Sequence, residues 1–238
     1  MTDKIKNNQI LFLDIETVPA EPSFKELSAQ MQKLWKKKSK YLIKPEDKNE
    51  TPETIYPKAG IFAEFGKIIC ISVGFFYKNT FRTKSFFGNN ENKILTDFKN
   101  LIEKSYNSPE KYLCAHNGKE FDYPYIARRM LINGIKLPEM LNLAGKKPWE
   151  VKHLDTLELW KFGDYKHYTS LELLTAVFNI PTPKDDIDGS MVYEIYYKEN
   201  DIERIAEYCE KDVIATAQLF LRYKNRDILK PEDIISLT

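Results

Sequence analysis

The stretch Ile10-Leu-Phe-Leu-Asp-Ile-Glu-Thr17 decides the fold of this chain. Its four leading apolar residues are typical of a buried strand. Side chains alternate between the two faces of a strand, so Asp14 and Glu16 point to one face and Ile15 to the other. Two carboxylates on one face repel each other, and a hard divalent cation that prefers oxygen ligands relieves this repulsion. A solvated strand end with two charges is the simpler interpretation of the stretch alone.

The composition is typical of a globular chain with an ordinary core. We expect the 238 residues, of which 42% are apolar, to form a single domain, residues 1–238. The longest apolar stretch, residues 68–77, is too short to span a bilayer, and the first nine residues carry no signal-peptide core. Three cysteines without CxxC spacing indicate reduced, buried thiols. These features predict a cytoplasmic protein with no membrane partner.

The formal net charge of +1 does not by itself indicate a nucleic-acid-binding protein. It does not exclude one either, because an enzyme that holds a few nucleotides at a metal site needs only local positive charge. The overall charge therefore leaves the class of partner open.

Four further segments complete a predicted sheet. Residues 67–77 and 81–87 have the branched and aromatic content of strands, and with the first strand they form a three-stranded antiparallel meander. Residues 111–116 and 151–156 add two more strands, and amphipathic helices lie between the strands and after them. The sequence therefore predicts an α/β fold with a central mixed five-stranded sheet, in which parallel strands extend the meander and helices flank it.

A Lys-rich segment separates the first strand from the second. Ser23 and Glu26 form a capping box, and apolar residues then recur at helical spacing. Only Glu46 and Asp47 accompany the lysines that follow, which are Lys33, Lys36, Lys37, Lys38, Lys40, Lys44 and Lys48. We interpret residues 20–58 as a helical insertion. Its lysines form either a solvated helix end, which is the commoner case, or an arm that contacts phosphates.

Two further acids have positions that can bring them to the first pair. Asp122 lies between the strand 111–116 and a helix that Pro124 marks, where a plain N-cap is the simpler interpretation. Asp212 lies at the border of the apolar stripe of the last long helix, four residues after Tyr208, and an ordinary pairing with a lysine is the alternative. Carboxyl ends of parallel strands gather at one edge, so the acids can share one site. Four negative charges there require bound Mg²⁺ or Mn²⁺.

These motifs resemble the DEDD superfamily of 3′–5′ exonucleases, which share a ribonuclease H-like fold. Asp14-Ile-Glu16 matches the first motif, and the segment from Asn117 to Asp122 matches the second. Tyr208-Cys-Glu-Lys-Asp212 matches the Tyr form of the third motif, the DEDDy type, since position 207 holds Glu where the other form has His. The chain looks most like a stand-alone relative of the proofreading exonuclease domain of family B DNA polymerases, and Phe65–Gly74 and Asp188–Val192 also resemble that subgroup.

The resemblance implies a catalytic set made of Asp14, Glu16, Asp122, Tyr208 and Asp212, with the four acids as metal ligands. Two divalent cations, Mg²⁺ or Mn²⁺, and no organic cofactor would serve phosphodiester hydrolysis at the 3′ end of single-stranded DNA. Asp14 would serve both ions. Tyr208 would orient the attacking water, because a phenol stays protonated at neutral pH and cannot act as the base. Weaker candidates for positioning the terminal nucleotide are Thr17, Asn117 and Phe121.

Other functions stay open on the sequence. Only the resemblance to proofreading domains favours DNA over RNA, so a 3′–5′ exoribonuclease of the same superfamily is one alternative. A non-catalytic nucleic-acid-binding module that keeps the fold is another, although a binder gains nothing from carboxylates crowded beside phosphates. A haloacid-dehalogenase-type phosphatase also starts with a strand and an Asp, but it needs a second Asp where this chain has Glu16.

Overall fold

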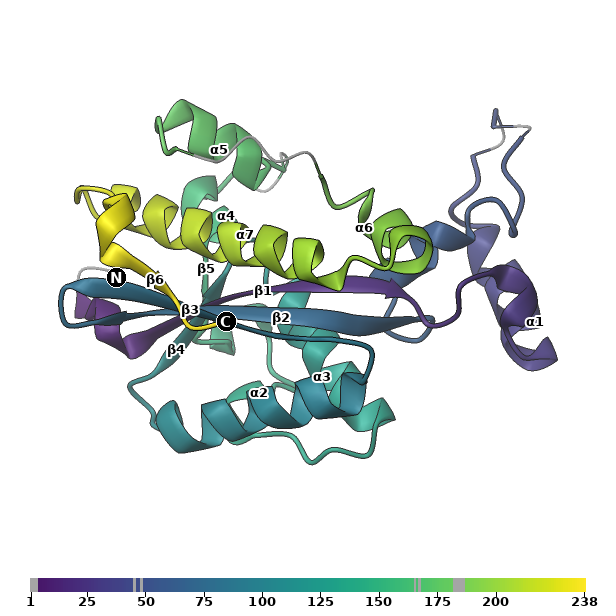
Figure 1. The fold of residues 1–238 in the computed structure, drawn as a ribbon, viewed down its shortest axis with the longest axis horizontal. Coiled ribbons are helices and arrows are strands. Elements are labelled where there is room, and N and C mark those ends of the chain that lie inside the picture. The colour runs from purple at the N-terminus through teal and green to yellow at the C-terminus, as the bar shows by residue number, and fades with distance from the viewer. Residues whose placement is uncertain (1–3, 45, 48, 165, 167, 182–186) are drawn as a thin grey trace.

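A six-stranded mixed sheet forms the centre of the molecule (Figure 1). The computed structural model describes residues 4–44, 46, 47, 49–164, 166, 168–181 and 187–238. Across the sheet the strands are β5 Leu154–Asp155, β4 Tyr112–Ala115, β1 Ile10–Pro19, β2 Gly66–Tyr77, β3 Thr80–Phe87 and β6 Ile234–Ser236. Strands β1, β2 and β3 form the antiparallel meander, while β4, β5 and β6 join by parallel pairing. The predicted α/β class with a mixed sheet is confirmed, with one strand more than predicted.

The additional strand is β6, near the C-terminus. It has three residues and directly follows a 3₁₀ turn, Pro231–Asp233, and a run this short shows no detectable period in the sequence. It pairs with the edge strand β3, with Phe81 opposite Ile234. This pairing covers part of an edge that would otherwise expose unpaired backbone groups.

Helices cover both faces of the sheet (Figure 1). Helices α2 Glu91–Ser105 and α3 Asp122–Ile132 lie on one face, and α7 Ile202–Tyr223 crosses the other. The shorter helices on the side of α7 are α4 Thr156–Lys161, α5 Leu171–Val177 and α6 Val192–Glu194. The other helical turns are Asn7–Gln9, Phe24–Glu26, Tyr56–Ile61, Glu139–Leu141, Pro148–Glu150 and the π-helical turn Ile195–Glu199.

Strand β1 lies inside the sheet, and its alternation sorts its side chains between two cores. Leu13 and Ile15 belong to the core under α2 and α3, whereas Phe12 packs with residues of α7. Asp14 and Glu16 have the same parity as Phe12, so they face α7. The side of the sheet on which the acids lie therefore follows directly from the alternation.

The chain between β1 and β2 projects from one end of the sheet, and we call residues 20–58 the Lys-rich arm (Figure 1). Its helix α1, Ala29–Ser39, begins later than predicted, because Ser28 provides the capping side chain. A short 3₁₀ turn that ends at Glu26 takes up the residues after Ser23. The predicted capping box at Ser23 therefore does not start the helix.

A small core of its own supports the arm. Trp35 is fully buried, and its Nε1 donates to the carbonyl oxygen of Pro52 at 2.7 Å. The rings of Tyr56 and Phe65 meet the indole edge-on. Of the predicted lysines, Lys48 lies outside the described residues.

The longest helix is α7, with 22 residues, and it carries charged as well as buried positions. Within the part of the chain that the structure describes, no helix has both the length and the apolar content needed to cross a membrane. Cys70, Cys114 and Cys209 are free and buried, as their apolar surroundings predicted.

Candidate active site and metal centre

Helix α7 brings three side chains to the acid pair of β1. The Cys209 thiol donates to Asp14 Oδ2 at 3.3 Å, and the ligand atoms of Asp14, Glu16 and Cys209 all lie within 4.8 Å of one another. Tyr208 and Asp212, one helical turn apart, are hydrogen bonded through their side chains. The charge of Asp212 acts on both Asp14 and Glu16. Two motifs that are almost 200 residues apart in the chain therefore meet in one place.

A bulge interrupts the sheet beside this pair. Glu16 lies opposite Cys70 on β2, but Thr17 lies opposite Ile68, so β2 has one extra residue at this point. A bulge bends the strand and changes the direction of the side chains next to it, and bulges are common beside active sites. The pairing of β1 with β2 thus shifts by one residue directly after the second acid.

Asp155 holds the loop that carries the second motif. As the N-cap of α4, its carboxylate accepts the backbone N–H of Leu157 at 2.9 Å and of Glu158 at 3.3 Å. The same carboxylate accepts the N–H of Asn117 and of Lys119, both at 3.0 Å. Asn117 has a φ of +62°, a left-handed conformation that Asn tolerates. Asp155 therefore fixes the start of the loop between β4 and α3.

Asp122 ends this loop as the first residue of α3, one position after the N-cap residue Phe121. Its side chain is 3% exposed and accepts a hydrogen bond from the backbone N–H of Ile15, which lies between the two acids of β1. Its Oδ1 is buried and has no hydrogen-bond partner within the described residues. A capping role therefore does not account for Asp122.

Burial and mutual repulsion raise the pKa values of these acids. Burial, followed by the charges of Asp122, Asp212 and Glu16, holds the pKa of Asp14 well above its usual range. Burial and then the charge of Asp212 do the same to the pKa of Glu16. Burial also raises the pKa of Asp122 to about 8, and the charge of Asp155 adds to this rise. The site therefore binds protons tightly unless another positive charge replaces them.

Tyr208 remains a hydrogen-bond donor throughout the physiological pH range. Burial, followed by the charge of Asp212, raises the pKa of its phenol well above the usual value. The carboxylates around it thus keep the phenol protonated, and it cannot act as a base near neutral pH.

The acids fit a divalent cation. Carboxylate oxygens are the ligands that Mg²⁺ and Mn²⁺ prefer, and the unpaired Oδ1 of Asp122 lacks the donor that a buried oxygen normally has. A cation would supply both the missing partner and the missing positive charge. The candidate metal ligands are Asp14, Glu16, Asp122 and Asp212.

The three residues predicted to position a nucleotide lie around the acids, and their role stays a prediction. Phe121 is partly buried and packs against Tyr125 with ring centroids 5.3 Å apart. Thr17 hydrogen bonds through its side chain with the hydroxyl of Tyr125. Asn117 uses its backbone N–H on Asp155. None of these contacts depends on a nucleotide.

Sequence reasoning missed two contributors to the site. Cys209 was predicted only as a buried thiol, although its place in the helical turn between Tyr208 and Asp212 was a signal that it faces the same strand. Asp155 is the other contributor. No sequence signal pairs it with Asn117, which lies 38 residues earlier in the chain.

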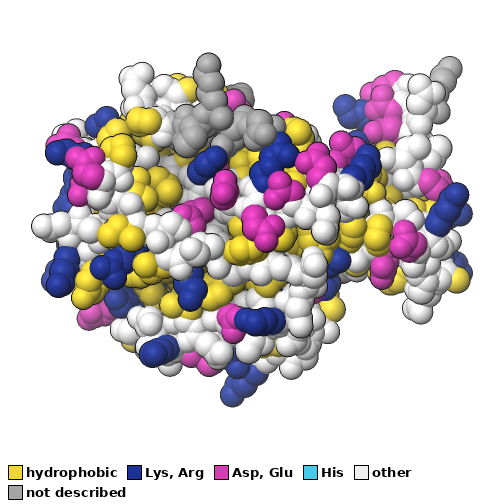
Figure 2. Space-filling view, viewed as in Figure 1, with side chains coloured by type: hydrophobic (Ala, Val, Ile, Leu, Met, Phe, Trp, Pro, Cys, Tyr) yellow, Lys and Arg dark blue, Asp and Glu magenta, His cyan; other side chains and the backbone are white. Residues whose placement is uncertain are grey.

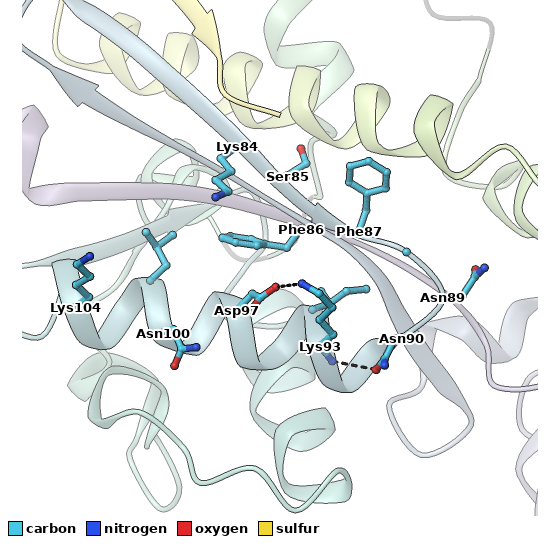
Figure 3. Close-up of a pocket in the computed structure, with 13 residues that line it drawn as sticks. Lys84, Ser85, Phe86, Phe87, Asn89, Asn90, Lys93, Asp97, Asn100 and Lys104 are labelled. Atoms are coloured by element: carbon cyan, nitrogen blue, oxygen red, sulfur yellow. Dashed lines mark hydrogen bonds and ion pairs between the residues drawn. The ribbon is translucent and has the colours of Figure 1, made fainter.

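A larger cavity lies away from the acids. Its volume is about 710 Å³, and residues of β3 and α2 line it (Figure 3). Figure 3 shows Lys84 and Phe86 pointing toward α2, while Ser85 and Phe87 point toward α7. Because Asp14 and Glu16 face α7, this cavity lies on the other side of the sheet and is separate from the acid cluster.

Comparison with known families shows what kind of chain carries this site. Residues 61–234 match the family described as "Predicted 3'-5' exonuclease related to the exonuclease domain of PolB". The chain belongs to this family. The matched range contains Asp122, Tyr208 and Asp212, whereas Asp14 and Glu16 precede it. Membership supports a nuclease role for the chain.

Two known proteins to which this chain is similar are DNA polymerases. A DNA polymerase of Pyrococcus glycovorans is 25% identical over 120 residues, which are 45% of this chain and 15% of the polymerase. The family B DNA polymerase of the hyperthermophilic archaeon Pyrobaculum calidifontis superposes with a TM-score of 0.52 at 13% identity. That match covers 90% of this chain and 24% of the polymerase, so the chain spans only a small part of either relative. The structural likeness shows the shared fold, and the predicted resemblance to the family B exonuclease domain is confirmed.

Proposed function

We propose that this chain is a metal-dependent 3′–5′ exonuclease that releases nucleotides from single-stranded DNA. The observation that carries the proposal is the buried, unpartnered Oδ1 of Asp122 in the same cluster as Asp14 and Glu16. Such a cluster costs folding free energy unless cations occupy it, because buried polar atoms and like charges need partners. Phosphodiester hydrolysis makes use of such cations, whereas simple binding of a nucleic acid does not.

The acids would divide between two ions. Asp14, Glu16 and Asp212 would hold one ion, and Asp14 together with Asp122 would hold the other. Bound Mg²⁺ or Mn²⁺ lowers the pKa of a water molecule and offsets the charge that develops on the phosphate. The ligands come from β1, α3 and α7, and side chains on such regular elements keep their positions more accurately than side chains on loops.

Tyr208 would orient the attacking water through its hydroxyl group, which its raised pKa keeps protonated and which a cation held by Asp212 would free from that carboxylate. Its hydrogen bond with Asp212 fixes the ring beside the acids. Thr17, Asn117 and Phe121 would position the terminal nucleotide at the rim of the cluster. Each role can be tested by a change that leaves the four acids intact.

A degradation assay tests the proposal. Single-stranded DNA and RNA of one sequence, each labelled at the 5′ end, are incubated with the protein and Mg²⁺ or Mn²⁺, and in parallel with EDTA. We expect DNA to shorten stepwise from its 3′ end only when metal is present. An otherwise identical substrate labelled at the 3′ end should release labelled mononucleotide first.

Glu210→Gln is a matched control, because Glu210 lies on the same helix but bonds to hydroxyl groups of β3, including Thr83 Oγ1 at 2.7 Å. It should degrade DNA like the unchanged protein. Binding of DNA without shortening would identify a non-catalytic module instead. Faster shortening of RNA would identify an exoribonuclease, and shortening that persists in EDTA would contradict the metal-dependent mechanism.

A further inference from the structure

A second groove lies on the Lys-rich arm, outside the acid cluster. Its volume is about 620 Å³, and it is bounded by α1, the turn after it and the C-terminal end of α3. Residues that line it include Met31, Leu34, Lys37, Lys38, Tyr41 and Ile132. Figure 2 shows the arm as a projection at the right of the molecule, with Lys side chains on its outer edge.

The groove is apolar because of the way α1 packs. Trp35 points into the core of the arm and is fully buried. Leu34 lies on a different face of the helix and is 44% exposed, and Tyr41, in the turn after the helix, is 82% exposed. An aromatic ring this exposed has one free face, which is the feature on which an unpaired nucleobase stacks.

The surroundings of the groove favour an anionic occupant. No Asp or Glu stands between Glu26 and Glu46, while the segment from 33 to 44 contains six lysines. Within the described part of the chain, Lys33, Lys37, Lys40 and Lys44 form no ion pair. Glu64 is the one acid among the residues that line the groove, so the positive charge at the groove comes from the lysines of the arm.

The arm also lies where a substrate strand can reach it. Glu16 is three residues before the end of β1 at Pro19, and an extended strand advances about 10 Å over that length. The arm begins directly after Pro19. The start of the arm therefore lies close to the acid cluster.

We propose that this groove binds single-stranded DNA upstream of the 3′ end, with a base stacked on Tyr41 and phosphates beside Lys37 and Lys38. This inference rests on the proposed function, because it places the 3′ end in the acid cluster. Clustered lysines beside an exposed aromatic ring are a combination that binds single strands without regard to sequence. The groove would give the enzyme a preference for strands longer than the few nucleotides that the acid cluster can hold.

Binding measured in EDTA tests the groove without any cleavage. The probes are fluorescently labelled oligothymidylates of 15 and 4 nucleotides. We expect Lys37→Glu/Lys38→Glu to weaken binding of the longer probe by about tenfold and to reduce the salt dependence by a slope of about 1.4, since two phosphate contacts are lost. Affinity for the shorter probe should change less than about twofold, because it lacks the upstream phosphates.

The aromatic contact has its own test. Tyr41→Ala should weaken binding of the longer probe by about fivefold or more, and Tyr41→Trp should restore it because stacking needs only a ring face. The matched control is Lys84→Glu/Lys104→Glu, which makes the same change of charge at the cavity between β3 and α2 (Figure 3). The control variant should bind both probes like the unchanged protein.

Three results would overturn the proposed binding of DNA in the groove. They are an equal loss in the arm variant and the control variant, an unchanged affinity of Tyr41→Ala, and a loss that does not depend on probe length. Displacement of the longer probe by polyglutamate of the same charge, at equal concentration, would identify a site for acidic peptides instead. If the unchanged protein binds DNA in the groove but shows no metal-dependent degradation, only the proposed function is overturned. If it degrades DNA but does not bind it in the groove, only the proposed binding in the groove is overturned.

Discussion

Asp122 and Asp155 are both buried aspartates, with 3% and 2% of their surfaces exposed, but their surroundings differ. The carboxylate of Asp155 accepts four backbone N–H groups from two segments of the chain. Asp122 keeps one buried oxygen without any partner in the described part of the structure. Burial alone therefore does not distinguish a functional acid from a structural one. The unsatisfied oxygen does, because folding alone gives no reason to bury it.

The same contrast appears on helix α7. The charge of Asp212 acts on the acids of β1, whereas Glu210 accepts hydrogen bonds from the hydroxyl groups of Thr83 on β3, at 2.7 Å, and of the C-terminal residue Thr238, at 3.0 Å. The two residues are two positions apart, so they lie on different faces of the helix. One face of α7 thus completes the candidate site, and another joins the helix to the sheet edge.

The largest effect is expected for Asp14→Asn, which removes a ligand that both ions would share. We expect cleavage to fall by about a thousandfold or more, because the cations would no longer be held against the phosphate. The fold should survive. Since the pKa of Asp14 is raised, its charged form destabilises the metal-free protein at neutral pH, and Asn removes that charge.

Single-turnover rates in Mn²⁺ and the melting temperature in EDTA measure the two parts of this prediction. Turnover near that of the unchanged protein would contradict the assignment of Asp14. A large fall in the melting temperature in EDTA would place Asp14 with the structural acids, beside Asp155.

Asp155→Ala should act in the opposite way, mainly on stability. It leaves four N–H groups without their acceptor, and we expect the free energy of unfolding to fall by about 3 kcal/mol. Urea unfolding measures this change, and Asp155→Asn, which keeps one acceptor oxygen, should lose less. A fall below about 1 kcal/mol would show that the loop from β4 to α3 does not depend on this carboxylate.

Tyr208→Phe should slow cleavage by about ten- to a hundredfold, because it removes the donor that would orient the water. It should leave metal affinity unchanged, since the phenol is not among the proposed ligands. Isothermal titration with Mn²⁺ and cleavage rates test the two statements together. If metal affinity falls with the rate, Tyr208 belongs to the metal-binding group and not to the orienting one.

The smallest effect concerns pH. The pKa of Asp122 is about 8 in the folded protein and 3.8 in an ordinary setting, so its contribution to stability is lost as the pH rises through 8. In EDTA, lowering the pH from about 9 to about 7 should therefore raise the free energy of unfolding by about 1 kcal/mol, or the melting temperature by about 2–4 °C.

Two controls accompany this measurement. Asp122→Asn should reduce the slope, since only Asp14 and Glu16 would still contribute to it, and saturating Mn²⁺ should also reduce it because the cation replaces the protons. If the free energy of unfolding stays constant between about pH 7 and pH 9 in EDTA, the carboxylate of Asp122 has hydrogen-bond partners in solution, as that of Asp155 does.

Much of this architecture could be predicted from the sequence because it depends on local pattern. The alternation in residues 10–17 places Asp14 and Glu16 on one face, and the helical period of the last helix places Tyr208 one turn from Asp212. The meander could be predicted for the same reason. Strand β6 could not, because it depends on pairing with a distant strand, and the start of α1 could not because Ser23 and Ser28 are both possible caps.

The sequence by itself determined the types of side chain and the face on which each lies, since periods of about 2 and 3.6 residues follow from backbone geometry. Only the tertiary structure decided which of these side chains share surroundings. It brought Cys209 to Asp14, gave Asp155 four partners and left an oxygen of Asp122 with none. The reason is that hydrogen bonding and repulsion between buried groups depend on distances in space, and separation along the chain does not set them.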